Sequence, residues 1–530
     1  MNKDLMQNLI QRVSLADIFR RKAATSPDKI AMVEMRGENN IELNYKEFNS
    51  KLNNFVYMAR ELGLKKGDRI ALLGPNSIEY MICLYGCAKG GFVALPINPG
   101  LAHDDISYIL KHAEAKALIC DEALCPLALN ACEVVPELRE LLSFSISNDQ
   151  IKAPFEDFNK LMQGKSDQEV EDVIIQDRDI FEILYTSGTT ADPKGVMISH
   201  LSVFILSLTN PLELDWQRNT VILATLPIFH CAQQTFNTSA FQLGGKVVLF
   251  RSFDPESVIR AIEHEKIQVL FCLPAMYRAM LDCTAGKDSN LASVRTCLYA
   301  MTPMDRRTLE ESIKMFNADF MLVTGQTECF PSTNTFRSEW QLKKEGNYWG
   351  ESAMTVDTAI MDPDGNFLPA GGVGEIVWRG PGVMERYLKS PETTDLSRKY
   401  GWHHSGDLGF FDQDGLLVFA DRIKDMIKTG GENVPSIKIE RVVLNHPAVV
   451  AAAVIGLPHD RWIEAITVFV IKAQDSDLTE YDLRSFCKEH LSSFEVPKRV
   501  VFVDELPKTT TGKLEKYKLR NKFNDLFKSE

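Results

Sequence analysis

Short apolar runs that alternate with helical patterns are the feature of this chain that most limits its fold. One run, Arg69–Leu73, leads into a Gly-Pro-Asn turn, and another, at 92–97, follows a pair of glycines. The same rhythm returns at 247–250 and 267–272. Such runs are typical of strands that are buried on both faces of a helix-covered sheet. The sequence therefore predicts a large α/β portion built from successive β-α units.

The pattern changes near residue 355 to alternating strands separated by tight turns. Asp-Pro-Asp-Gly at 362–365 and Asp-Gln-Asp-Gly at 412–415 are hairpin signals, because Asp-Gly pairs favour two-residue turns. We expect a small β subdomain here.

The last hundred residues read as helix, strand, strand and helix. Pro435 marks the start of the first helix, and the strands are expected at 449–455 and 466–471. Thr479, followed three residues later by an acid, is a capping-box signal for the last helix. Residues 424–530 are therefore expected to form a compact α+β domain.

Length and charge limit the number of domains and the class of partner. A chain of 530 residues rarely buries a single core, so two or more domains are expected. The formal charge is −13, and no long Lys/Arg run is present that could follow a nucleic acid backbone. A bound polyanion such as ATP would have to be held locally, by a few placed cations, backbone N–H groups and a metal ion.

The cysteines and the chain start indicate a cytoplasmic protein. Eleven cysteines are scattered without a Cys-x-x-Cys pair, which disfavours a disulfide framework or a zinc cluster and fits reduced thiols. The first residues lack an apolar signal core, and no apolar stretch reaches the length of a membrane span.

The most informative segment is the loop Tyr-Thr-Ser-Gly-Thr-Thr-Ala-Asp-Pro-Lys-Gly at 185–195. Its hydroxyls, glycines and lysine could wrap phosphate oxygens with side-chain and backbone donors. On composition alone, an ordinary polar surface loop is the better interpretation. The spacing is not that of a Walker A motif, so a P-loop NTPase is excluded.

Six further motifs follow this loop in chain order. They are Leu-Pro-Ile-Phe-His (226–230), Thr-Gly-Gln-Thr-Glu (324–328), Trp-His-His-Ser-Gly-Asp (402–407), Asp-Arg-Ile-Lys-Asp (421–425), Gly-Gly-Glu-Asn (430–433) and Pro-Lys-Thr-Thr-Thr-Gly-Lys (507–513). Each is weak or moderate alone, but the ordered set is highly specific. Together with the loop, it resembles the adenylate-forming superfamily of acyl-CoA synthetases, peptide-synthetase adenylation domains and firefly-type luciferases.

This resemblance implies an α/β multidomain fold. Residues 1–423 would form a large N-terminal domain of α/β sheets with a small β-barrel subdomain, holding the ATP and acyl sites. Residues 424–530 would form a small mobile α+β domain that carries the catalytic lysine.

The resemblance also assigns roles to matching residues. The catalytic set is Lys513, Glu328, Thr327 and His230. Mg²⁺ would be held by Thr186 and Glu328, which fits the preference of this ion for hard oxygen ligands. The residues expected to bind ATP are Thr186, Ser187, Gly188, Thr189, Thr190, Lys194, Ala300, Met301, Thr302, Thr324, Gly325, Gln326, Asp407, Arg422, Lys424, Gly430 and Gly431. Among these, Asp407 and Arg422 would hold the ribose, and Lys424 would be the hinge.

Each of these residues has a plainer interpretation. Without its motif, Glu328 reads equally well as a solvated turn acid, whereas the Gly-Asp turn at Asp407, taken alone, is more often structural. Arg422 and Lys424 fit exposed surface cations, and His230 fits a buried core histidine.

The chain departs from the family pattern in two regions: the adenine site, where the segment 300–304 also differs from that of relatives, and the part after Asn433, where the usual proline and glutamate spacing is altered at 434–440. Thr324 stands where relatives carry an aromatic residue that stacks on adenine, and Tyr299 is one candidate to replace that ring. Later, Ile463 and Glu464 stand where a Gly-Glu pair is common, in a region that shapes the CoA tunnel of relatives. The second departure puts the use of CoA in more doubt than adenylation.

The sequence therefore predicts an ATP-dependent acid:CoA ligase that uses ATP, Mg²⁺ and coenzyme A. The acid is expected to be fatty or otherwise hydrophobic, in a pocket lined by His230, Cys231, Gln233, Phe236 and residues 299–302. Two alternatives stay open: an adenylating enzyme that serves a carrier protein, and a degenerate protein that only binds a nucleotide or acyl ligand. No nucleic acid partner and no membrane span are expected, and a homodimer is possible.

Overall fold

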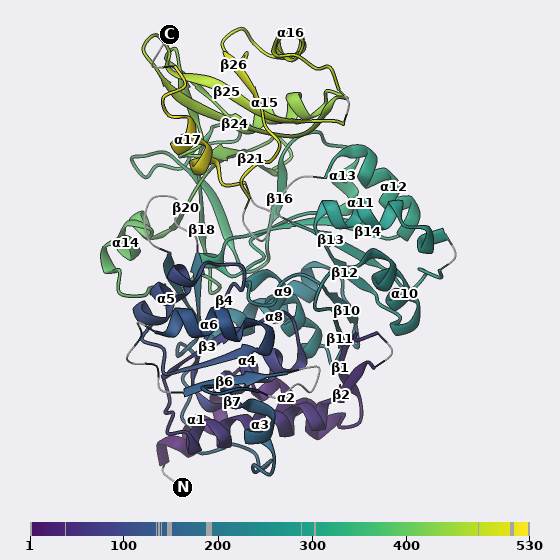
Figure 1. The fold of residues 1–530 in the computed structure, drawn as a ribbon, viewed down its shortest axis with the longest axis vertical. Coiled ribbons are helices and arrows are strands. Elements are labelled where there is room, and N and C mark those ends of the chain that lie inside the picture. The colour runs from purple at the N-terminus through teal and green to yellow at the C-terminus, as the bar shows by residue number, and fades with distance from the viewer. Residues whose placement is uncertain are drawn as a thin grey trace. The chain divides into compact units, whose positions relative to one another are not determined.

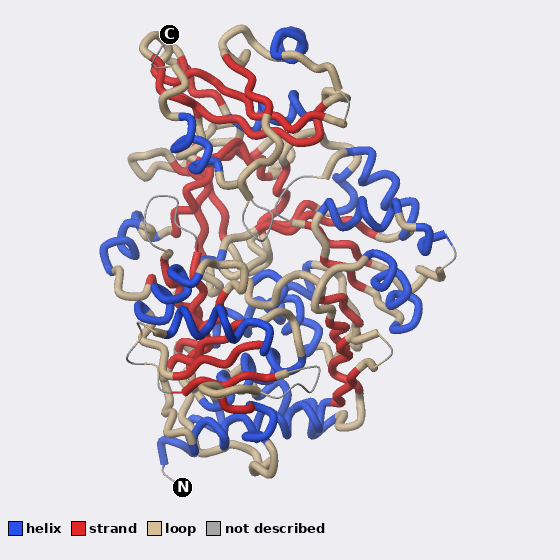
Figure 2. The backbone as a smooth tube through the Cα atoms, viewed as in Figure 1, coloured by secondary structure: helices blue, strands red, loops and turns tan. Residues whose placement is uncertain are grey.

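The computed structural model describes residues 3–37, 39–133, 135, 138, 140–145, 151–186, 193–287, 289–300, 304–474, 476–508 and 514–527. The chain divides into two compact units. The first holds Met1–Glu345, Trp349–Thr358 and Trp378–His403, and the second holds Gly346–Tyr348, Ala359–Val377 and His404–Glu530. Helices and strands alternate along the first unit (Figure 1), and Figure 2 separates them by colour.

The first unit contains two large sheets. One runs in the order β15 (Asn334–Phe336), β14 (Asp319–Thr324), β13 (Thr296–Tyr299), β12 (Val269–Phe271), β10 (Val221–Ala224), β11 (Lys246–Leu249), β1 (Ile30–Glu34), β2 (Ile41–Asn44). The other runs β19 (Arg386–Tyr387), β9 (Lys194–Ser199), β8 (Ile180–Thr186), β4 (Val93–Ile97), β3 (Arg69–Leu73), β5 (Ala117–Asp121), β6 (Glu140–Phe144), β7 (Glu156–Asp157). In the first sheet the pairs from β14 through β13, β12, β10 and β11 to β1 are parallel, whereas β15 and β2 pair antiparallel with β14 and β1. In the second sheet the pairs from β8 through β4, β3, β5 and β6 to β7 are parallel, and β9 is antiparallel to β8 and to β19.

Helices connect and cover these strands. They are α1 (Lys3–Gln11), α2 (Asp17–Thr25), α3 (Tyr45–Glu61), α4 (Ile78–Gly90), α5 (His103–His112), α6 (Cys125–Cys132), α7 (Phe158–Met162), α8 (His200–Glu213), α9 (Cys231–Gln242), α10 (Pro255–Glu265), α11 (Pro274–Asp282), α12 (Arg306–Phe316), α13 (Ser338–Gln341) and α14 (Pro391–Leu396). Short 3-10 turns are η1 (Glu122–Leu124), η2 (Thr284–Lys287), η3 (Thr327–Cys329) and η4 (Lys399–Gly401). No helix among the described residues is long and apolar enough to span a membrane.

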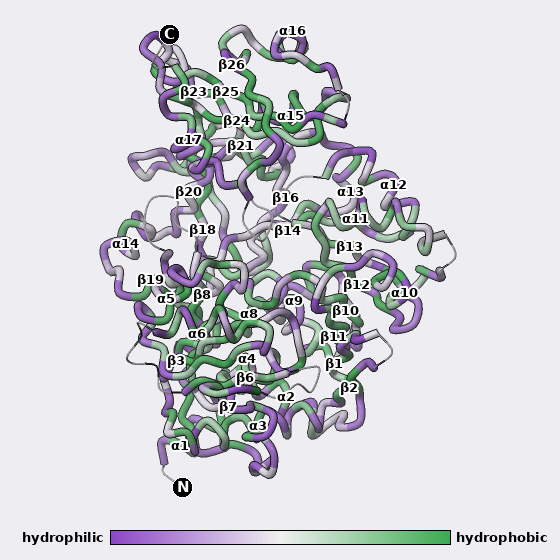
Figure 3. Tube along the Cα trace, in the orientation of Figure 1, coloured by the Kyte–Doolittle hydropathy of each residue, from purple (hydrophilic) through white to green (hydrophobic). Residues whose placement is uncertain are grey.

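Burial on both faces explains why the strands read as continuous apolar runs. In β3, Ile70 and Leu72 belong to one apolar cluster, whereas Ala71 and Leu73 belong to another. Successive side chains of a strand point to opposite faces, so both faces of this sheet are covered. Figure 3 shows the same hydrophobic character along β10, β11 and β12. The predicted run at 69–73 is β3, and the other three predicted runs correspond to β4, β11 and β12.

The second unit contains the strands and helices expected after residue 355. β17 (Asp357–Met361), β18 (Gly374–Arg379), β20 (His403–Phe411) and β21 (Leu417–Arg422) are neighbours in that order, and β16 (Tyr348–Ser352) starts in this unit. A second sheet has the order β23 (Glu432–Val434), β22 (Ile427–Thr429), β25 (Ile463–Lys472), β24 (Val449–His459), with β26 (Arg499–Phe502) beside β25. The helices are α15 (Ser436–Leu444), α16 (Glu480–His490) and α17 (Lys516–Phe523).

The two predicted helix starts in this region are confirmed, but the helix that begins after Thr479 is not the last one, because β26 and α17 follow it. Pro435 immediately precedes α15, and the Thr479 side chain accepts from the Asp482 amide at the start of α16 while Asp482 bonds back to Thr479.

Candidate active site

The predicted phosphate loop joins β8 to β9, two antiparallel strands of the first unit. Thr186, which ends β8, lies opposite Lys194, which begins β9. Ser187, Gly188, Thr189 and Thr190 lie outside the described residues. The two ends of the loop are therefore fixed side by side by the ladder of the sheet.

The second predicted motif follows β14. Thr324 ends the strand, Gly325 and Gln326 form the turn, and Thr327 and Glu328 begin η3. A Cβ at Gly325 would lie 2.8 Å from Pro331 Cβ, so only glycine fits this turn without a shift. Ala300 follows β13, the neighbour of β14, whereas Met301 and Thr302 lie outside the described residues.

Tyr387 joins these two segments, although the sequence analysis did not single it out. It lies opposite Val196 in the pairing of β19 with β9. Its hydroxyl donates to Glu328 Oε1 at 3.0 Å, and Lys194 Nζ lies 5.4 Å from the centre of its ring. Burial, and then the charge of Glu328, raises the pKa of Tyr387, so the phenol remains a donor. The loop end and the η3 carboxylate thus meet at one side chain.

His230 lies at the start of α9, close to the same motif. Its Nδ1 accepts from the Ala232 amide at 3.3 Å and lies 3.6 Å from Cys231 Sγ. Cys231 Sγ in turn lies 3.8 Å from Thr327 Oγ1. The structure therefore places His230 and Thr327 on either side of Cys231.

Asn76 fixes the segment that leads to His230. This buried side chain donates to the carbonyl oxygens of Leu226 and Phe250 at 2.9 and 3.1 Å, and it accepts from the Ile228 amide at 2.8 Å. From its sequence, Asn76 is expected only to be part of a turn. Its position after β3 was the available signal, because sites in open α/β sheets lie at the carboxyl ends of strands.

Three residues of the predicted pocket are packed in the interior. Gln233 and Phe236 are both 0% exposed, and Gln233 bonds to the Leu226 amide and to Asn237. Tyr299 is 3% exposed and donates to Gln341 at 2.6 Å. Tyr299 therefore offers no ring face to adenine, and that expectation was wrong. Sequence reasoning could not find this, since Gln341 is distant along the chain.

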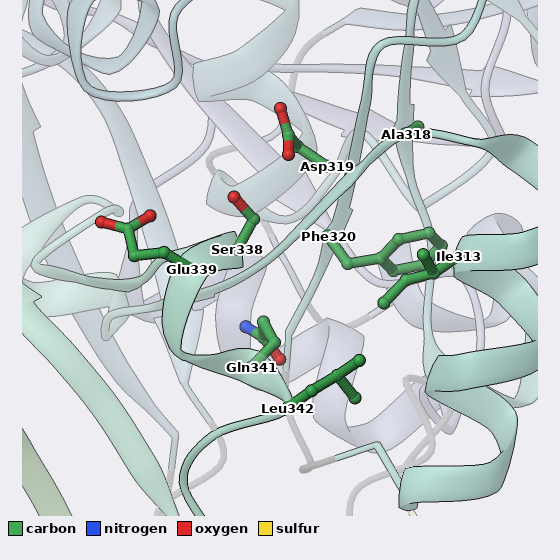
Figure 4. A pocket seen from close by; sticks show the side chains of 8 residues that line it. All are labelled: Ile313, Ala318, Asp319, Phe320, Ser338, Glu339, Gln341 and Leu342. Atoms are coloured by element: carbon green, nitrogen blue, oxygen red, sulfur yellow. The ribbon is translucent and has the colours of Figure 1, made fainter.

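A pocket of about 340 Å³ lies elsewhere in the first unit (Figure 4). Its lining includes Ile313, Asp319 and Phe320, so it opens at the start of β14. Thr324 ends the same strand, and the pocket therefore does not belong to the predicted nucleotide site.

The predicted ribose residues come together in the second unit. Asp407 on β20 lies opposite Arg422 on β21, with 3.4 Å between Arg422 Nε and Asp407 Oδ1. Glu375 supports the preceding turn, because it accepts from the Gly406 amide at 2.9 Å and contacts His404 Nδ1 at 2.8 Å. Asp407 is buried. The pairing of β20 with β21 and the cation of Arg422 hold its carboxylate in place.

The remaining predicted residues of the second unit lie in turns. Lys424 is exposed in a turn in which the amides of residues 425 and 426 both donate to the Arg422 carbonyl oxygen. Gly430 and Gly431 connect β22 to β23 with φ values of 60° and 89°, which suit a two-residue hairpin turn. Lys513 lies outside the described residues.

Ile463 and Glu464 stand where a Gly-Glu pair is common in relatives. The backbone at Ile463 keeps a conformation that is suited to glycine. Ile463 has φ 70° and is 66% exposed. A β-branched residue is rarely found there, because its Cβ crowds the backbone in the left-handed region. The departure seen in the sequence is therefore a change of side chain on a conformation that a glycine would favour.

Two family models match the chain. One, described as AMP-binding enzyme, matches residues 19–388, and the other, the AMP-binding enzyme C-terminal domain, matches residues 438–513. The chain belongs to the AMP-binding enzyme family. The predicted adenylate-forming membership is confirmed by these matches and by the relatives.

Relatives match this AMP-binding enzyme over nearly its whole length. The fatty acid–[acyl-carrier-protein] ligase ScoC of Streptomyces coeruleorubidus is 32% identical, over 91% of this chain and 92% of its own. A feruloyl-CoA synthase of an Amycolatopsis species is 31% identical, over 95% of this chain and 98% of its own. Crystalline ATP-bound MatB from Rhodopseudomonas palustris is 26% identical, with a TM-score of 0.86 over 97% of this chain and 99% of that one. The expected α/β multidomain fold is confirmed by this likeness.

One carboxyl group of the AMP-binding enzyme is enclosed in the core, on the strand that precedes the phosphate loop. Glu182, on β8, is 0% exposed. Burial raises the pKa of Glu182 to about 8, and the nearby Gln234 side chain opposes the rise. At neutral pH this carboxyl is therefore mostly protonated in the folded chain.

Replacing Glu182 with glutamine is expected to change how stability depends on pH. Between the unfolded pKa of about 4.3 and the folded value, unfolding releases the Glu182 proton, so stability falls as pH rises through this window. The amide cannot ionise. Thermal midpoints measured from pH 5 to pH 8 should thus shift progressively in favour of Glu182→Gln. A difference between the two proteins that stays constant with pH would contradict this account.

Proposed function

We propose that this chain is an ATP-dependent acid:CoA ligase, which converts a carboxylic acid to an acyl-AMP and then to an acyl-CoA thioester. The observation that carries the proposal is the contact of Tyr387 with both Glu328 and Lys194. It places the Glu328 carboxylate of η3 and the Lys194 cation, at one end of the loop expected to wrap phosphates, beside the same side chain. A triphosphate with its metal ion needs both charges in one small site.

The residues present fit Mg²⁺ and ATP. Glu328 offers a hard carboxylate whose Oε1 is oriented by Tyr387, and Thr186 offers a hydroxyl at the loop end. Mg²⁺ usually takes only one or two carboxylates and shares the phosphate oxygens. When bound, it would neutralise charge on the triphosphate.

In the proposed reaction the substrate carboxylate attacks the α-phosphorus of ATP and expels pyrophosphate. Lys194 and residues 186–190 would hold the phosphates, and residues 300–302 and 324–326 would bind adenine. In the second unit, Asp407 and Arg422 would hold the ribose, and Lys513 would neutralise charge between the carboxylate and the α-phosphate. The CoA thiol then attacks the acyl carbonyl and releases AMP.

The domain boundary, the hinge, the cellular location and the oligomeric state are also proposals. The functional boundary would fall at residue 424, with Lys424 as the hinge and Gly430 and Gly431 in the adjoining turn. A cytoplasmic location and a homodimer are also proposed.

We favour a fatty or other hydrophobic acid as the substrate. The relatives' names refer to fatty acids and to the feruloyl group, which are both largely apolar. The name of ScoC also keeps an acyl carrier protein as the alternative acceptor.

The test is an end-point assay with ATP, Mg²⁺, CoA and a panel of acids of increasing chain length. We expect AMP and acyl-CoA to form in equal amounts with the preferred acid. If AMP forms but the acyl group reaches only a pantetheinylated carrier protein supplied in place of CoA, the acceptor assignment is wrong. The adenylation step would then stand.

Replacing Tyr387 with phenylalanine is expected to raise the Mg²⁺ concentration needed for half-maximal adenylation, because the hydroxyl no longer orients Glu328. A hydrogen bond to a charged group contributes roughly 1.5–3 kcal/mol, so a shift of about tenfold or more is expected. Tyr45→Phe is the matched control, since Tyr45 is also buried and donates to the Gly245 carbonyl oxygen at 2.7 Å. Equal Mg²⁺ requirements in both variants would remove Tyr387 from the site.

A further inference from the structure

Two cysteines of the first unit meet outside the site described above. Cys120 is the penultimate residue of β5, and Cys125 is the first residue of α6. Their sulfur atoms are 3.7 Å apart, which is van der Waals contact. Cys120 is 0% exposed, whereas Cys125 is partly exposed. One residue of the pair is therefore partly accessible to solvent, whereas the other is enclosed in the core.

The surroundings of Cys125 favour its ionised form. Its sulfur lies at the N-terminal end of α6 and 3.2 Å from Ser143 Oγ, a hydroxyl able to donate to a thiolate. The Asp121 carboxylate, which opposes ionisation, is paired with Arg251 at 2.7 Å, and Glu122 is the other nearby acid. The Cys120 hydrogen bond is the largest influence that lowers the pKa of Cys125, to about 7.

The buried member of the pair has the opposite character. The hydrogen bond with Cys125, together with burial, raises the pKa of Cys120 well above its ordinary value. Cys120 therefore keeps its proton and can donate it toward the Cys125 sulfur. A nucleophilic thiolate beside a protected thiol is the arrangement that redox-active cysteine pairs use.

Cys132 serves as an internal comparison. It ends the same helix and is also partly exposed. Burial raises the pKa of Cys132 to about 12, so it is almost wholly protonated at neutral pH. Exposure alone therefore does not make a cysteine of this region reactive.

We propose that Cys120 and Cys125 form a reversible dithiol–disulfide couple that is oxidised by hydroperoxides, with Cys125 as the attacking thiol and Cys120 as the resolving thiol. The Cys125 thiolate attacks the terminal peroxide oxygen, the O–O bond breaks, and an alkoxide or hydroxide leaves and takes a proton. The product is a sulfenic acid at Cys125. The Cys120 sulfur then attacks the Cys125 sulfur, an S–S bond forms, and the sulfenic oxygen leaves as water with the Cys120 proton.

The balance is two thiols and one hydroperoxide to one disulfide, one alcohol and one water. The two sulfurs lose two electrons in total, and the peroxide gains them. A small dithiol returns the pair to its reduced form by thiol–disulfide exchange. The geometry requires only a local change, because the two residues are separated by Asp121 and the short turn η1. A disulfide has an S–S distance of about 2.05 Å, so the sulfurs must approach by less than about 2 Å.

The test treats the full-length protein with hydrogen peroxide in the presence or absence of dimedone, followed by peptide mass spectrometry. In the wild type we expect a peptide pair joined at Cys120 and Cys125 and lighter by two hydrogen atoms. In Cys120→Ser the hydroxyl can still donate to the Cys125 sulfur but cannot resolve the sulfenic acid, so dimedone labelling of Cys125 should rise at least about tenfold. Cys132→Ser should behave as the wild type. Wild-type dimedone labelling as high as in Cys120→Ser, or a bond to another cysteine, would overturn the proposal.

A second measurement does not depend on any variant. Iodoacetamide alkylation of the reduced wild type at pH 7 should modify Cys125 more than about tenfold faster than Cys132, because the thiolate is the nucleophile. Equal rates at the two cysteines would also overturn the proposal.

Discussion

Replacing Lys513 with alanine is expected to lower the rate of ATP-dependent adenylate formation by about 10²–10³, the usual cost of losing one preorganised group that stabilises developing charge. Its proposed work is confined to the first half-reaction. The variant should therefore convert a supplied acyl-adenylate and CoA to the thioester at a near-native rate. Both half-reactions are to be measured on one preparation of the protein.

Lys508→Ala is the matched control for this experiment. Lys508 is an exposed lysine that precedes the same Thr-Thr-Thr-Gly segment, so its replacement removes an equal charge nearby. We expect both of its half-reactions to remain near native. Equal loss of both half-reactions in the Lys513 variant would contradict the assignment of Lys513 to adenylation alone.

Replacing Asp407 with alanine is expected to raise the KM for ATP by about 10- to 100-fold, because the ribose loses a charge-assisted hydrogen bond of roughly 1.5–3 kcal/mol. The same change leaves Arg422 without its carboxylate partner, which lies at 3.4 Å. ATP kinetics and the circular dichroism spectrum are the two measurements required. Asp364→Ala, in an exposed Asp-Gly turn of the same unit, is the control for folding. A well-folded Asp407 variant with unchanged ATP kinetics would exclude Asp407 from the site.

Local patterns predicted the local structure well. The run Arg69–Leu73 became β3 because burial on both faces selects apolar residues without a break. The Thr479 capping box was readable because both of its partners lie within one helical turn. In each case, the signal lies in a few residues that are close neighbours along the chain.

Contacts between residues that are far apart in the sequence could not be predicted in this way. Tyr387 meets Glu328 only because β19 pairs with β9, and Asn76 reaches Ile228 across 152 positions. Glu182 interrupts an apolar strand, but its protonation depends on what encloses it in the folded core. The packing of Tyr299 against Gln341, which overturned one expectation, is a contact of the same kind.

The most direct test of the central claim is acid-dependent exchange between ATP and labelled pyrophosphate, measured with the purified chain, Mg²⁺ and fatty acids of increasing length. We expect exchange only when an acid is present, with a maximum at the preferred chain length and a loss of about 10²–10³ in Lys513→Ala. Tight binding of ATP without exchange for any acid of the panel would contradict the account. It would identify the chain as a nucleotide-binding protein that keeps the fold without the reaction.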